Sequence, residues 1–123
     1  MNSIFRLALG AILFTTSSLA IACDYPARPH IPEGGTATKE DMLAAKSGVQ
    51  EFIAAVDDYL RCVEAQEKAV IDSLESPDPE AIKERDLSLS RKFDAANEEK
   101  ALVGEQFNQQ VRAYNAKRKQ AQE

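Results

Sequence analysis

A long helical pattern between Thr38 and Ser76 constrains this chain more than any other feature. The stretch contains no proline and a single glycine, Gly48. Its apolar residues recur with a period of about 3.5 residues over four heptads, which is typical of a helix that packs lengthwise against another helix. One heptad position holds Met42, Val49, Val56, Val63 and Val70, the other holds Ala45, Phe52 and Tyr59, and Ile53 and Leu60 flank them.

A proline-containing turn separates this helix from a second one. Pro77 disfavours helical geometry at Ser76. Asp78 followed by Pro79 is a typical helix start, because Asp accepts hydrogen bonds from free backbone N–H groups and proline needs no N–H there. We expect helices over about 38–75 and 79–119. The second stripe contains Ile82, Leu89, Phe93, Ala96, Val103, Phe107, Gln110 and Tyr114, with Leu102 and Val111 beside it.

These two patterns predict an all-α fold in which residues 38–121 form an antiparallel, coiled-coil-like hairpin. With the turn near Pro77, Lys100 falls close to Val56 and within reach of Asp57 or Asp58. The adjacent acidic pairs at 57–58 and 98–99 are expected on solvated faces, since neighbouring residues splay around a helix. The expected facing pairs are Phe52 with Val103, Val49 with Phe107, and Met42 with Tyr114.

Residues 23–37 form a proline-rich arm before the first helix. Pro26, Pro29 and Pro32 recur every third position, which favours an extended, polyproline-II-like conformation. Gly34 and Gly35 are expected to act as a hinge. We predict that this arm folds back and lies along the first helix as a structural strap.

Residues 1–22 have the features of a secretory signal peptide. Arg6 is their only charge, Leu7 to Phe14 form a short apolar run, and small residues follow up to Ala22. The apolar run is well short of the roughly 20 residues that a membrane-spanning helix needs. Cleavage is expected after Ala22 or Ala20, and the protein is expected to be exported.

The chain has two cysteines, Cys23 and Cys62, and Cys23 has two possible fates. A disulfide is within reach, because Cys62 lies about 36 Å along the helix from Thr38 and the extended arm covers about 46 Å. Alternatively, the sequence from Ala20 to Cys23 is similar to a bacterial lipobox, with Ala20 in place of the usual leucine. Lipidation of Cys23 would leave Cys62 unpaired in an oxidising compartment, so we predict the Cys23–Cys62 disulfide, with lipidation of Cys23 as the alternative.

Chemistry-bearing patterns are sparse. His30, the one histidine, lies between prolines, and the spacing of Asp24, His30 and Glu33 does not force a metal site. Removal of Arg6 with the signal leaves 14 of 15 basic residues against 20 acidic ones, a balance of −6, which disfavours nucleic-acid binding. The basic cluster of Arg112 and 117–119 suits a helix C-terminus. We predict no catalytic, cofactor-binding or metal-binding residues and no enzyme activity.

The run C-x-x-P-x-x-P-x-I-P-x-G from Cys23 to Gly34, followed by Met42 and by Tyr59-Leu60-x-Cys62, resembles a group of small uncharacterised exported proteins of proteobacteria. The resemblance covers about the first half of the chain after residue 22. It implies a periplasmic or secreted protein with paired cysteines, and it brings no activity. The expected function is therefore an interaction or structural module of the cell envelope, with an envelope protein or a second copy of this chain as partner. The alternative is a lipoprotein that acts as a tether or spacer. Only lipidation of Cys23 would attach the protein to a membrane.

Overall fold

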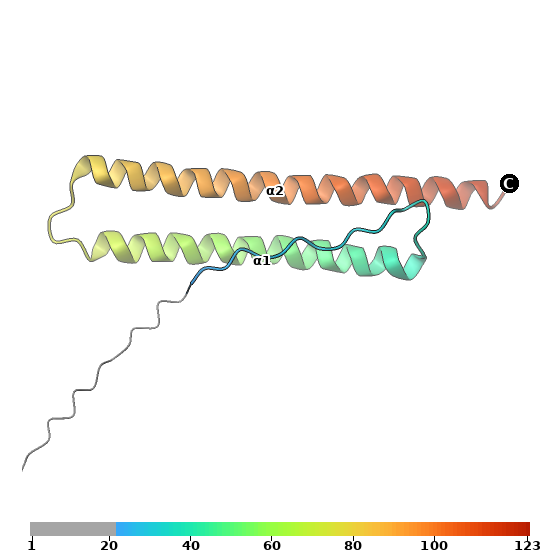
Figure 1. The fold of residues 1–123 in the computed structure, drawn as a ribbon, viewed down its shortest axis with the longest axis horizontal. Coiled ribbons are helices and arrows are strands. Elements are labelled where there is room, and N and C mark those ends of the chain that lie inside the picture. Colours follow the sequence, from blue (N-terminus) through green and yellow to red (C-terminus); the bar gives the residue numbers. More distant parts are fainter. Residues whose placement is uncertain (1–21) are drawn as a thin grey trace, which may run out of the picture.

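The computed structural model describes residues 22–123, and Figure 1 shows their arrangement. Helix α1 (Lys39–Asp72) and helix α2 (Pro79–Gln120) lie side by side and run in opposite directions. The residues that precede α1 run back along it as an extended segment. Over the described range the chain contains no strand. The predicted all-α antiparallel hairpin is therefore confirmed; the expected signal peptide lies almost wholly outside the described residues.

Helix α1 begins at a capping box. Asp41 donates its backbone N–H to the Thr38 hydroxyl over 3.1 Å, and its carboxylate accepts the Thr38 backbone N–H over 2.9 Å. The helix ends at Asp72, before the expected Glu75. Ser73 caps this end, and its hydroxyl donates to the carbonyl of Val70 over 2.7 Å. Val70 and Leu74 are 40% and 43% exposed at this end, so burial adds little to the stability of a longer helix here.

The core follows the predicted stripe from Met42 to Val56, about four helical turns, then takes Leu60 in place of Tyr59 and returns to the stripe at Val63. Phe52, Val56, Leu60 and Val63 are buried, whereas the half-buried Tyr59 lies at the edge of the core. The expectation that Tyr59 occupies the seam and Leu60 its flank was therefore wrong. A straight helix has 3.6 residues per turn, so a seam drawn at 3.5 drifts by about 20° per heptad. Val70, predicted in the seam, is 40% exposed.

Helix α2 begins at the expected cap, where Glu80 donates its backbone N–H to the Asp78 carboxylate over 3.2 Å. The helix register agrees with the predicted pairing, since Lys100 Nζ lies 2.6 Å from Asp57 Oδ1. On α2 only Ala96 and Val103 are fully buried. The remaining predicted stripe residues of α2 are half-buried, so the core needs cover from a third segment.

Candidate functional site

Residues 23–37, here called the strap, supply that cover (Figure 1). A disulfide joins Cys23 to Cys62, with the two Cα atoms 5.7 Å apart, within the usual range for this bond. Cys23 and Ile31 pack against the buried core of the hairpin. The expected pairing is thus present in the structure, and the closed loop limits the freedom of the unfolded chain.

Tyr25 of the strap packs one edge of its ring against α1 and leaves 45% of the residue exposed. Its ring meets those of Tyr59 and Phe52 edge-on, at centroid distances of 5.0 Å and 6.5 Å. Such T-shaped contacts are favourable because the positive ring edge faces a negative ring face. Burial and the nearby Glu99 carboxylate raise the pKa of the Tyr25 hydroxyl. The contact also explains why Tyr59 lies outside the seam.

An ion pair fastens the strap to α2. The Arg28 guanidinium donates two hydrogen bonds to the Glu99 carboxylate, one through Nε and one from Nη2 to Oε2 over 2.7 Å. The bond from Arg28 lowers the pKa of Glu99. The expectation of a solvated pair at 98–99 was wrong for Glu99, because the strap covers it. No local sequence signal couples residues so far apart in the chain.

Gly34 carries the strap onto α2. Its backbone N–H donates to the Gln110 side-chain oxygen over 2.9 Å. A Cβ atom at this position would lie 1.9 Å from the Gln110 carbonyl oxygen, whereas at Gly35 it would meet nothing within 4 Å. Gly34 is therefore needed for close approach of two backbone segments, a role that the hinge interpretation missed.

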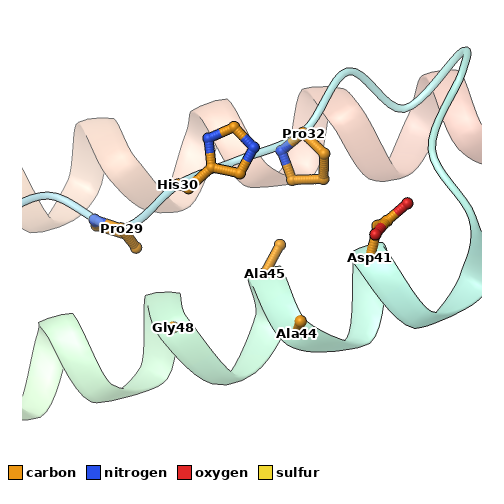
Figure 2. A pocket seen from close by; sticks show the side chains of 7 residues that line it. All are labelled: Pro29, His30, Pro32, Asp41, Ala44, Ala45 and Gly48. Atoms are coloured by element: carbon orange, nitrogen blue, oxygen red, sulfur yellow. The ribbon is translucent and has the colours of Figure 1, made fainter.

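Figure 2 shows the groove between the strap and the N-terminal half of α1, about 500 Å³ in volume. His30 and Pro32 overhang it from the strap, and Asp41 lies at one end. Asp41 accepts hydrogen bonds from the Thr38 backbone and hydroxyl, which lower its pKa and commit it to the helix cap. Between residues 22 and 123 no three His, Cys, Asp or Glu side chains gather closely enough to hold a metal ion. Asp24, His30 and Glu33 are thus not brought together.

A second groove, about 410 Å³ in volume, opens between the start of α1 and the end of α2; we call it the open-end groove. Its lining comes from the two helices alone. Arg118 lies 5.9 Å from the Tyr114 ring centroid, a cation–π contact that keeps the guanidinium at the rim. The apolar lining is Met42, Leu43, Phe107, Val111 and Tyr114, and the cations are Lys39, Lys46 and Arg118. The basic C-terminal cluster was predicted to suit only the helix C-terminus, but its Arg118 also lines this groove.

Comparison with protein-family models, with curated proteins and with solved structures found no match to this chain. Neither of the two helices is long and apolar enough to cross a membrane.

Proposed function

We propose that this protein is an exported, non-enzymatic interaction module of the bacterial cell envelope. The strap makes a thin helical hairpin rigid, and the open-end groove offers that rigid surface to a protein partner. The observation that carries the proposal is the unequal cover of the core. The strap closes one side, while the other side presents an apolar groove rimmed by three cations on an otherwise acidic chain.

Export is supported by the cysteine chemistry and by the sequence of residues 1–22. A disulfide that closes a long loop persists in an oxidising compartment such as the periplasm, and the structure uses both cysteines in one bridge. The signal-like run ends next to Cys23. We place the protein in the periplasm or outside the cell. The alternative, a lipoprotein spacer, would use Cys23 for acylation and would need Cys62 to remain reduced.

The polar groups in the described grooves support binding better than catalysis. Near His30, the one carboxylate of the strap groove belongs to the α1 cap. In the open-end groove the charged side chains are all cations, without a general base beside them. Aromatic residues, methionine and arginine are enriched at protein-binding surfaces, and the groove contains Met42, Phe107, Tyr114 and Arg118. An envelope protein with an acidic, apolar-faced segment fits this groove.

Photocrosslinking in cells tests the proposal. A photoreactive amino acid in place of Leu43, which is 55% exposed at the open-end groove, should crosslink to protein in the envelope fraction. The same probe in place of Leu102, 44% exposed and outside the groove, is the matched control. Absence of any protein adduct at Leu43, or equal adducts at both positions, would contradict an interaction function for the groove.

A further inference from the structure

The strap packs against one side of α1, whereas no segment of the described chain packs against the opposite side. Successive residues of a helix are rotated by about 100°. On this basis, one side of the seam formed by Val49 and Val56 holds Ala44, Gly48 and Ala55. These three residues line the grooves beside the strap. Lys39, Leu43 and Lys46 lie on the other side. We call that side, with the part of α2 next to it, the uncovered face.

Gly104 lies on this uncovered face, and the space beside its Cα is open within the chain. It shares a helix line with Val111 and Arg118, which follow at seven and fourteen residues and line the open-end groove. A Cβ atom at Gly104 would meet nothing within 4 Å, whereas one at Gly48 would contact Pro29 of the strap at 3.4 Å. Glycine is disfavoured inside helices, and the open space beside Gly104 leaves room for the backbone of another molecule to approach closely.

The charged residues of this face that form no ion pair in the described part of the chain are divided between its two ends. Lys39 and Lys46 lie at the open end of α1, and Glu64 lies five helical turns from Lys46, on the same line toward the turn. On α2, Asp86 occupies the line of Gly104 toward the turn, while Arg118 lies at the open end. Among the described residues, neither Glu64 nor Asp86 forms an ion pair, and neither do Lys39 and Lys46. A face that is basic at one end and acidic at the other is complementary to itself when reversed.

We propose that two copies of this chain pack antiparallel through the uncovered face as a four-helix bundle, with α1 against α1, α2 against α2, and the crossing at Gly104. This inference rests on the proposed function and names the partner of the same surface. The ion pair between Lys100 and Asp57 sets the register, so Ile53 lies level with Gly104 and close to the two-fold axis. Glu64 of the second copy then falls between Lys39 and Lys46, and Asp86 of the second copy lies about one turn from Arg118.

The size of the face is sufficient for a stable dimer. Helix α1 is about 50 Å long, and two neighbouring helices are about 20 Å wide, which gives about 1,000 Å² on each copy. A standard interface buries about 800 Å² per partner. The half-buried Ile53, Phe107 and Val111 supply its apolar centre, and the strap blocks the equivalent approach from the opposite side.

Sedimentation velocity of the purified, disulfide-bonded protein tests the inference. We expect a concentration-dependent dimer. Lys46→Glu and Glu64→Lys should each weaken it severalfold, and the double variant should restore it, because the swapped charges meet across the interface. Gly104→Leu should weaken it at least about tenfold through overpacking at the crossing. Leu102→Lys, outside the face, is the control, and circular dichroism checks that each variant keeps its helices.

Three results would overturn the inference. These are a strict monomer at high concentration, a double charge variant that stays as weak as the single ones, or a Gly104→Leu variant that dimerises like wild type. The photoprobe at Leu43 separates this failure from failure of the proposed function. An adduct with a different protein only, together with a monomer in solution, would refute the second copy as partner while leaving the interaction function intact.

Discussion

The two ends of the hairpin, divided at Cys62, are stabilised in different ways. Toward the open end, the strap completes the core, and nearly every fully buried residue lies within 37–63 or is Ala96 or Val103. Toward the turn, no residue from 64 to 92 is fully buried. That part is held by half-buried side chains and by ion pairs such as Arg85 with Glu67, whose nearest atoms lie 2.5 Å apart. Two helices alone therefore bury few side chains completely, and the strap is the segment that completes the core at the open end.

The largest expected effect follows from loss of the disulfide. Cys62→Ser should lower the free energy of unfolding by about 2–4 kcal/mol, since closing a loop of this length contributes about 4 kcal/mol in the chain-entropy account. Urea unfolding monitored by circular dichroism measures it. Hydrogen exchange should rise mainly in the strap and at the open end, and little near the turn. Reduction of the variant should change nothing further. An unchanged unfolding midpoint would show that the strap does not stabilise the hairpin.

The next effect concerns contact of the strap with α2. Gly34→Ala should cost about 1–3 kcal/mol of stability, because the added methyl group clashes with the Gln110 carbonyl and the backbone must move. Gly35→Ala is the matched control, with open space at its Cβ position, and should be neutral or slightly stabilising. Thermal unfolding of the two variants side by side measures the difference. Equal melting temperatures would refute the close approach at Gly34.

Truncation of matching valines compares the two ends directly. Val56 is 0% exposed and Val70 is 40% exposed. Val56→Ala should lower the free energy of unfolding by about 2 kcal/mol, because it removes buried methyl groups and leaves a cavity, whereas Val70→Ala should change it by less than about 0.5 kcal/mol. Denaturant unfolding is again the measurement. A larger loss of unfolding free energy for Val70→Ala than for Val56→Ala would show that the turn end, not the open end, is the more tightly packed part.

The smallest effect concerns acid. The hydrogen bond from Arg28 lowers the pKa of Glu99, so the carboxylate binds its proton less readily in the folded protein. The stabilising contribution is present above the ordinary glutamate pKa and is lost as pH falls through the lowered value. Glu99→Gln should therefore speed hydrogen exchange in the strap at neutral pH and reduce its acid dependence. Glu98→Gln, at the exposed neighbour, should change neither the exchange rate of the strap nor its acid dependence. Equal effects of the two substitutions would show that the Arg28–Glu99 ion pair does not hold the strap.

The sequence predicted the two helices, their register and the path of the strap to Cys62, and it missed the individual contacts that the strap makes with α2. Heptad spacing, the Thr38 cap and the turn at Pro77 were sufficient for two helices and their register, since each signal acts within a few residues. The exchange of Tyr59 for Leu60 in the core follows from helix drift and from the Tyr25 ring. The ion pair of Arg28 with Glu99 and the constraint on Gly34 had no local signal, because both arise only after the strap folds back.

The central claim is that a disulfide-closed strap completes this hairpin, and intact mass spectrometry of the exported protein tests it most directly. The account predicts a chain that begins at or near Cys23, lies about 2 Da below the mass of the reduced form, and yields a peptide pair linking Cys23 to Cys62. A diacylglyceryl-sized addition on the N-terminal peptide, with Cys62 as a free thiol, would contradict the account.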